Sequence, residues 1–395
     1  MINKKRILVI CIEKVSSVSV GVLFPLEELE KKALIEVKFV RTSKVTEADI
    51  KWCDTVICVR GSEFWDLHIV RLCKKYGRQA VYYLDDDLLD IPDNVSCTDY
   101  YKTDYVSKSI QSLMKECDIL WCVNPNIAKK YGNCFKKTVL SEACVKRDCS
   151  CVADDDKVKF IYAGGIDHQN IVEEILSPVV NHLCNKYGEK VQFTFIGVDP
   201  HLSNQKQVKF IPYISDYQEY RRVVCETHYD ISFAPVYDTP FYSCKYYNKF
   251  LEYTSMGTVG IYSDLQPYTF VVENYENGIL ADNNDSWCKA AEYLIDNPEE
   301  RKRILENAEK TFDERFTSEK IAAELVSEFP ELCEFSAPDI TGEKVRINKL
   351  QLNFYNLKQR LTMYFRRRGI AGIFLLPFKA IKTIIKKIRE TEKCH

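Results

Sequence analysis

The length, composition and charge of the sequence exclude several classes of protein before any motif is considered. With 395 residues, 46% of them hydrophobic, the chain is too long for one core and predicts folded domains instead of disorder. No stretch approaches the ~20 apolar residues of a membrane-spanning helix, and the opening "MINKKRILVICI" lacks a cleavage site, so we expect no signal peptide. The 17 cysteines lack paired zinc-type spacing, which favours free buried thiols in a reducing, cytoplasmic compartment.

The net charge of −2 conceals an uneven distribution. The segment 344–395 holds 14 of the 55 basic residues and 2 of the 57 acidic ones. The last part of the chain is therefore strongly basic and the remainder acidic, which indicates that the two parts have different partners.

Taken in chain order, apolar strands alternate with amphipathic helices, a pattern typical of α/β folds with parallel sheets. The first series of strands is "RILVICI", "IEVKFV", "DTVICV", "QAVYYLD" and "ILWCV". The second series is "VKFIYAGG", "VQFTFIGV", "QVKFIP", "DISFAPV", "TVGIYSD" and "NGILAD". We therefore predict two doubly wound, Rossmann-like domains over 1–150 and 151–315, a helix over 316–340 that crosses back to the first domain, and a basic tail over 341–395.

The stretch "CKYYNKFLEYTSMG" predicts a helix with Lys245, Lys249 and Glu252 on one face, three or four residues apart. Two lysines one turn apart repel each other, which raises the question of an anion between them. A solvated face with an ion pair between Lys249 and Glu252 is the plain alternative.

Three motifs together carry a resemblance to a known family. The run "KFLEYTSMGTVGIYSDLQPYTFVVENYENGIL" resembles the donor-site region of GT-B glycosyltransferases of family 4, and "FIYAGGIDHQNI" resembles the start of their second domain. "VYYLDDDLLDIP" is similar to a strand end in a bacterial surface-polysaccharide subgroup. Cys244 stands where the family carries its first acidic residue. The resemblance covers about residues 5–330 and implies a GT-B fold, with an acceptor domain followed by a nucleotide-sugar donor domain that face a cleft.

The resemblance also implies roles in donor binding. Lys245 and Lys249 would neutralise the diphosphate and support its departure, so Lys249 is also a catalytic candidate, and Glu252 would accept hydrogen bonds from the ribose. Since these cations can carry the phosphate charge, we expect no metal and no cofactor besides the nucleotide sugar. The loop "YDTPFYSCK" would bring Phe241 and Tyr242 to the donor sugar.

A glycine turn opens the second domain. In "AGGIDHQN", Gly164 and Gly165 let the backbone approach a ligand closely, and the N-terminus of the next helix favours anions. His168 is a candidate for hydrogen bonding to the phosphate or sugar. A plain tight turn and a helix-capping histidine are the alternatives.

Three carboxylates, "DDD" at 85–87, follow the apolar strand "AVYYL". Carboxyl ends of parallel strands line the ligand crevice, so Asp86 or Asp87 is a candidate to position or deprotonate an acceptor hydroxyl. An equally good interpretation is that these carboxylates cap the N-terminus of a helix and form its acidic first turn. The serine-rich loop "EKVSSVSVG" after the first strand would face the same crevice.

The basic tail carries the signal of a membrane-surface helix. An apolar stripe and a basic stripe recur at helical spacing beside a triple-arginine cluster. The candidate membrane contacts are Arg366, Arg367, Arg368, Phe374, Phe378, Lys379, Lys382 and Lys386. We expect an anionic membrane surface as the partner, with the acidic body of the protein as the alternative, and no nucleic acid.

The sequence thus predicts a glycosyltransferase that transfers a sugar to a lipid-linked or growing glycan acceptor in bacterial surface-polysaccharide synthesis, at the cytoplasmic face of the membrane. The alternatives are a catalytically silent nucleotide-sugar-binding subunit and a sugar-nucleotide epimerase on the same fold.

Overall fold

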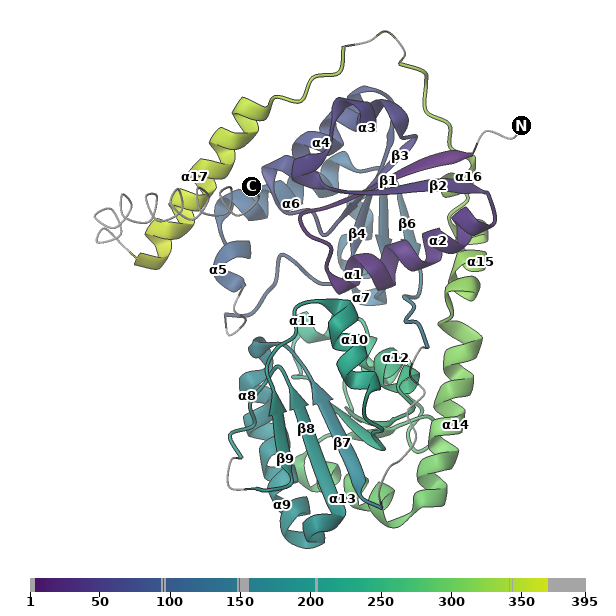
Figure 1. Ribbon diagram of the computed structural model, residues 1–395. Helices are drawn as coiled ribbons and strands as arrows, with labels where there is room; N and C mark the ends of the chain where they lie inside the picture. Colours follow the sequence, from purple (N-terminus) through teal and green to yellow (C-terminus); the bar gives the residue numbers. More distant parts are fainter. Residues whose placement is uncertain are drawn as a thin grey trace, which may run out of the picture.

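The computed structural model describes residues 4–93, 95, 97–147, 149, 156–202, 205–340, 342 and 344–368. It confirms the predicted fold class, because two six-stranded parallel sheets, each covered by helices, lie one above the other in Figure 1. The linker between them begins after residue 140, at the end of the first sheet.

The N-terminal sheet has the strand order β2-β1-β3-β4-β5-β6 and is parallel throughout. Its strands are β1 (Lys5–Cys11), β2 (Ile35–Arg41), β3 (Thr55–Val59), β4 (Gln79–Leu84), β5 (Ile119–Cys122) and β6 (Lys137–Leu140). The helices around it are α1 (Ser16–Val18), α2 (Phe24–Lys31), α3 (Glu47–Trp52), α4 (Phe64–Lys75), α5 (Thr98–Tyr101), α6 (Asp104–Glu116) and α7 (Pro125–Tyr131). A π-helical turn, η1 (Ser19–Leu23), joins α1 to α2.

The C-terminal sheet has the order β12-β11-β10-β7-β8-β9 and is also parallel. Its strands are β7 (Val158–Ala163), β8 (Val191–Ile196), β9 (Val208–Ile211), β10 (Ile231–Ala234), β11 (Val259–Ser263) and β12 (Ile279–Ala281). Its helices are α8 (Gln169–Ile171), α9 (Ser177–Tyr187), α10 (Tyr217–Cys225), α11 (Pro240–Ser243), α12 (Asn248–Ser255) and α13 (Asn284–Asp296). The core is aromatic, with Phe160 stacked between Phe193 and Phe233 at 4.7 and 5.2 Å.

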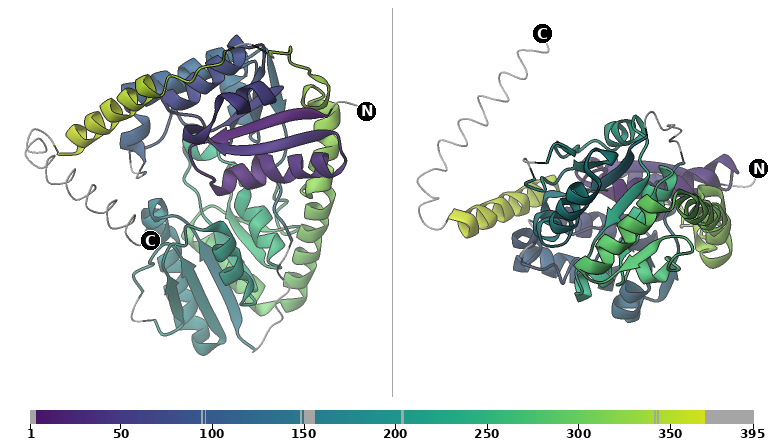
Figure 2. Two further views of the ribbon diagram at one scale, coloured as in Figure 1. Left: turned by 45° about the horizontal axis from the view of Figure 1, so that its top comes forward. Right: turned by 90° about the horizontal axis from the view of Figure 1, so that it is seen from below.

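After the second sheet the chain returns to the first domain. The helices α14 (Pro298–Arg315) and α15 (Ser318–Glu328), green in the figures, run along one side of both domains in Figure 1 and in the left view of Figure 2. α15 packs on α2, and after it the fully buried ring of Phe329 meets Trp121 of β5 edge-on at 5.9 Å. The short helix α16 (Glu331–Glu334) follows. The crossing segment is therefore part of the N-terminal core.

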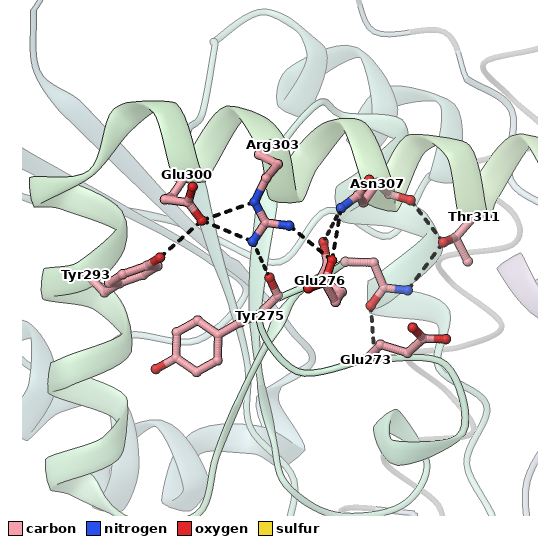
Figure 3. A network of polar contacts seen from close by, with 9 residues as sticks. Glu273, Tyr275, Glu276, Tyr293, Glu300, Arg303, Asn307 and Thr311 are labelled. Carbon is pink, nitrogen blue, oxygen red and sulfur yellow. Dashed lines mark hydrogen bonds and ion pairs between the residues drawn. The ribbon is translucent and has the colours of Figure 1, made fainter.

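A polar network fixes α14 to the loop before β12 (Figure 3). Arg303 forms ion pairs with Glu276 and Glu300 at 3.0 Å each and donates to the carbonyl oxygen of Tyr275 at 2.8 Å. Asn307 donates to the Glu276 carbonyl oxygen at 3.0 Å. Because Tyr275 has the uncommon φ of +62°, these contacts hold a conformation that the loop alone would not favour.

One expectation about cysteines is wrong. Cys149, in the interdomain linker, forms a disulfide with Cys225 at the end of α10, 76 residues further along the chain. The other described cysteines are free, and most are buried. Scattered spacing in the sequence does not reveal that two distant cysteines become neighbours in the fold.

The last described helix, α17 (Lys349–Arg368), reaches beyond the body of the molecule in Figures 1 and 2. It lies against α4, with Leu352 fully buried and Tyr355 stacked on Phe64 at 4.0 Å. Within the described ranges, none of the helices has both the length and the apolar character needed to cross a bilayer.

Candidate active site

The strand orders place the site before any side chain is considered. In an open parallel sheet, ligands bind at the carboxyl ends of the strands where the strand order reverses. The first sheet reverses between β1 and β3, and the second between β7 and β10. The serine-rich loop follows β1, the glycine turn follows β7 and the lysines follow β10, so both reversal points contribute to one site between the domains, and the carboxylates follow β4, next to β3.

A cavity of about 240 Å³ lies there, with residues of both domains in its wall. Its lining residues from the N-terminal domain and the linker are Ser16, Ser17, Val20 and Val145. Its lining residues from the C-terminal domain are Ala163, Gly164, Ile196, Tyr213, Ile214, Ser215, Tyr217, Tyr220, Asn248, Lys249 and Glu252. The structure therefore brings Gly164, Lys249 and Glu252 together with the serines of the loop after β1, all of which the sequence predicts to face the cleft.

The turn after β7 is built around glycines. A Cβ at Gly164 would lie 2.5 Å from Tyr162 Oη, and one at Gly197 would lie 2.1 Å from the Gly164 carbonyl oxygen. The backbone at Gly164 is therefore exposed to the cavity and cannot carry a side chain without displacement. A 3-10 turn, Ile166–His168, separates Gly165 from the three-residue α8, so the expected helix N-terminus does not directly follow the glycines.

Lys249 and Glu252 lie one turn apart in α12 and both face the cavity. Lys249 Nζ donates to the Ala163 carbonyl oxygen and lies 5.2 and 5.4 Å from the ring centroids of Tyr162 and Tyr253. Burial, together with the charge of Lys245, lowers the pKa of Lys249, while Glu252 opposes the shift. An anionic ligand would stabilise the charged form of Lys249, because the protein places few charged side chains around this ammonium group.

Lys245 is not on this helix, and the predicted helix over both lysines is wrong at its N-terminal end. α11 ends at Ser243 and α12 begins at Asn248. Asn124 of the other domain donates from its side-chain amide to the carbonyl oxygens of Ser243 and Lys245, at 3.0 and 2.6 Å. These carbonyl groups are therefore engaged by the N-terminal domain, and Lys245 turns toward that domain.

The carboxylates after β4 have three different environments. Arg60 Nη1 lies 3.0 Å from Asp85 Oδ1 and 2.9 Å from Asp86 Oδ2, and Lys245 Nζ lies 3.2 Å from Asp86 Oδ1. Burial favours the neutral acid, but Lys245 and Arg60 outweigh it and keep the pKa of Asp86 below its usual range. Asp85 is more deeply buried, and burial raises its pKa against the effect of Arg60.

Asp87 differs from the other two carboxylates because its side chain lies in the interior of the N-terminal domain. Its side chain is fully buried, with oxygens bound by Lys130 Nζ and Tyr131 Oη at 2.5 Å each. No helix follows the three carboxylates directly, so they do not form a helix cap. Of the two candidate bases, Asp86 is the one placed toward the C-terminal domain.

His168 lies beside the lysines. Its Nδ1 is 2.7 Å from Tyr162 Oη, and burial, followed by the charges of Lys249 and Lys245, lowers the pKa of His168 to about 3. Phe241 and Tyr242, predicted to contact the sugar, are 5% and 2% exposed. Tyr242 packs near His168, and Phe241 lies 4.5 Å below Lys245 Nζ. The Tyr242 ring therefore supports the neutral His168, and the Phe241 ring supports the charged Lys245.

Two groups of residues escaped the sequence analysis. Arg60 follows β3 directly, in "VRGSEF", and has the left-handed φ of +49°, which is uncommon outside glycine and frequent at functional sites. The strand-end rule that singled out the carboxylates also applies to it. The loop after β9 and α10 supply Tyr213, Tyr217 and Tyr220, and burial and the nearby Glu252 raise the pKa of Tyr220.

Only some of the predicted membrane contacts in the tail lie within the described residues. Arg366, Arg367 and Arg368 end α17, while Phe374, Phe378, Lys379, Lys382 and Lys386 lie outside the described residues. Among the residues that are described, no group of three histidine, cysteine, aspartate or glutamate side chains is arranged to hold a metal ion.

Two Rossmann-like domains facing each other across a cleft, with a crossing helix that returns to the first domain, constitute the GT-B fold of glycosyltransferases. Residues 173–327 match the family model described as glycosyl transferase-like. This region contains α12 and the loop before β12, where the sequence resemblance was noted. The comparison with curated proteins gives no match.

Solved structures show the same fold at low sequence identity. Sucrose-phosphate synthase from Thermosynechococcus elongatus is 12% identical, with 83% of this chain and 99% of that chain covered and a TM-score of 0.59. HepE of Anabaena, in complex with UDP and glucose, is 10% identical, with 82% and 99% covered and a TM-score of 0.58. A proposed UDP-N-acetylglucosamine 2-epimerase from Listeria monocytogenes is 13% identical, with 85% and 100% covered and a TM-score of 0.52.

Proposed function

We propose that the protein is a glycosyltransferase that moves a sugar from a nucleotide-sugar donor to a glycan or lipid-linked acceptor. The observation that carries the proposal is the interdomain cavity, in which Lys249 and Glu252 face Gly164 and the serines after β1. Its position at two strand-order reversals suits a nucleotide. The glycosyl transferase-like match over 173–327 supports the same activity.

The residues divide the chemistry between them. Lys249 and Lys245 neutralise the diphosphate, the Gly164–Gly165 backbone allows it to approach closely, and Glu252 binds the ribose hydroxyls. The acceptor oxygen bonds to the anomeric carbon while the bond from this carbon to the diphosphate breaks, and the electron pair leaves with the nucleoside diphosphate. Asp86 accepts the acceptor proton. The cationic side chains carry the phosphate charge, so we propose a reaction without a metal ion.

The test has two stages. A screen of melting temperature against UDP, GDP, dTDP and CMP sugars identifies the donor, because a ligand that binds the native state raises the melting temperature by mass action. Incubation of that donor with lipid-linked or oligosaccharide acceptors must then yield an extended acceptor and free nucleotide. Turnover to an altered nucleotide sugar without any acceptor would instead establish an epimerase, and donor binding with no product at all would establish a silent binding subunit.

We propose that the enzyme works at the cytoplasmic membrane face in bacterial surface-polysaccharide synthesis. α17 supports this location, since the apolar side chains of Leu350, Phe354 and Leu357 are 85%, 65% and 57% exposed. Residues 344–368 hold eight basic and no acidic residues. An exposed apolar stripe in a purely basic segment suits an anionic lipid surface.

Vesicle flotation tests the membrane location. The full chain should float with vesicles of phosphatidylglycerol and phosphatidylcholine, and much less with phosphatidylcholine alone. The triple variant Leu350→Ser/Phe354→Ser/Leu357→Ser should lose a large part of this binding with its melting temperature retained, because the three side chains make few contacts with the body. Equal flotation of the variant and the wild type would remove α17 from the interface.

A further inference from the structure

A row of alternating charges crosses the cleft outside the cavity. Asp85, Arg60 and Asp86 belong to the N-terminal domain and Lys245 to the C-terminal domain, with N–O distances of 3.0, 2.9 and 3.2 Å along the row. The side chains of Arg60, Asp86 and Lys245 are 23%, 18% and 27% exposed. They are shielded enough from water for their ion pairs to matter more than those of an open surface.

Lys245 also acts on the donor side of the cleft. Its charge lowers the pKa of both Lys249 and His168, so a diphosphate held at Lys249 would lie within the field of Lys245 as well. The Asp86 carboxylate carries one negative charge and a diphosphate about two, and both require the same ammonium group. The two anions are competitors for one cation.

We propose that Lys245 exchanges partners during the reaction. It pairs with Asp86 before the donor binds and with the donor diphosphate in the donor complex, and this exchange frees Asp86 for the acceptor hydroxyl. This inference rests on the proposed glycosyl transfer. It makes Lys245 the link by which donor binding prepares the acceptor side, so that the base becomes available only when a sugar is in place.

The surroundings of Asp86 explain why the exchange would change its reactivity. The groups that act electrostatically on Asp86 or are acted on by it are Asp85, Arg60, Tyr101, His168, Cys244 and Lys245. Arg60 and Lys245 are the cations of this group whose ion pairs with Asp86 the structure shows. Once Lys245 turns to the diphosphate, Asp86 keeps one of these two pairs and becomes a stronger base.

A double-mutant cycle tests the exchange. Affinity is measured by calorimetry for whichever of UDP, GDP and dTDP stabilises the wild type most, with Asp86→Asn, Lys245→Met and the double variant. Asp86→Asn should tighten binding about fivefold, because the ion pair no longer has to break, and Lys245→Met should weaken it about tenfold. In the Lys245→Met background, Asp86→Asn should leave the nucleotide affinity unchanged. Asp93→Asn, the same substitution at an exposed position in the loop after β4 (side chain 89% exposed), is the matched control and should behave as the wild type.

The kinetics provide an independent readout. Asp86→Asn should lower the donor KM and at the same time lower kcat, a combination that a merely structural role would not produce. If Lys245→Met weakens nucleotide binding while Asp86→Asn leaves the affinity unchanged or lowers it, the exchange is overturned and the proposed function remains intact. Failure of every nucleoside diphosphate to bind the wild type would overturn both. If Asp86→Asn reduces folding, Asp86→Ser makes the same comparison.

Discussion

The half-buried, neutral His168 should make the protein lose stability in weak acid. Burial and the two neighbouring lysines lower its pKa from 6.5 to about 3 in the folded protein, whereas the unfolded chain retains the ordinary value. Between these values the unfolded state binds a proton that the folded state does not, so stability falls as the pH falls through this window. For one such group, the loss between about pH 7.5 and about pH 5 is up to about 2 kcal/mol.

Urea unfolding of the wild type and His168→Gln at these two pH values measures the effect. Glutamine retains a hydrogen-bonding group beside Tyr162 but does not titrate, so the variant should lose up to about 2 kcal/mol less than the wild type on acidification. His182→Gln, on the exposed face of α9 with 48% of the side chain exposed, is the control and should follow the wild type. Equal acid losses in the wild type and His168→Gln would show that the imidazole is not buried beside the lysines.

Two further substitutions test the site and its support. Lys249→Met should lower kcat by about 10²- to 10³-fold, the usual effect of removing one preorganised charge-stabilising group, whereas Lys209→Met on exposed β9 should leave the rate unchanged; equal rates for both variants would exclude Lys249 from the mechanism. Arg303→Ala should lower the free energy of unfolding, because it removes two ion pairs and the hydrogen bond to the loop before β12, and denaturant titration should show no such loss for the neighbouring Lys302→Ala.

The strands were the most predictable part of the fold. Parallel strands covered on both faces are continuous apolar runs in the sequence, and each expected run corresponds to one of the strands from β1 to β5 or from β7 to β12. β6 was missed. It is a four-residue edge strand, "KTVL", with only Val139 buried, so it carries little of the apolar pattern that identifies a strand.

The candidate site was predictable where its residues follow a strand or lie on one helix. Gly164, Lys249 and Glu252 meet in the cavity because β7 and α12 converge on the same sheet edge. The position of Lys245 was not predictable, since it depends on the hydrogen bonds from Asn124, more than a hundred residues earlier in the chain. Helical periodicity contains no information about such a contact.

The same limit applies to the carboxylates. Their position after β4 indicated a role at the cleft, but the distinction between Asp86 and Asp87 comes from Arg60 after β3 and from Lys130 and Tyr131 of α7. Local sequence can place a charged group at a strand end. Only the tertiary structure decides which of three adjacent side chains faces the other domain.

The return of the chain through α14 and α15 has a mechanical consequence. The two domains are joined covalently at two separate places, once by the linker after β6 and once between α14 and α15. Bodies attached at two points can rotate about the axis through both attachments, but they cannot twist or slide freely as they could on a single tether. Any opening and closing of the two domains is therefore confined to rotation about nearly one axis. Each closure then returns Lys245 to the same position opposite Asp86.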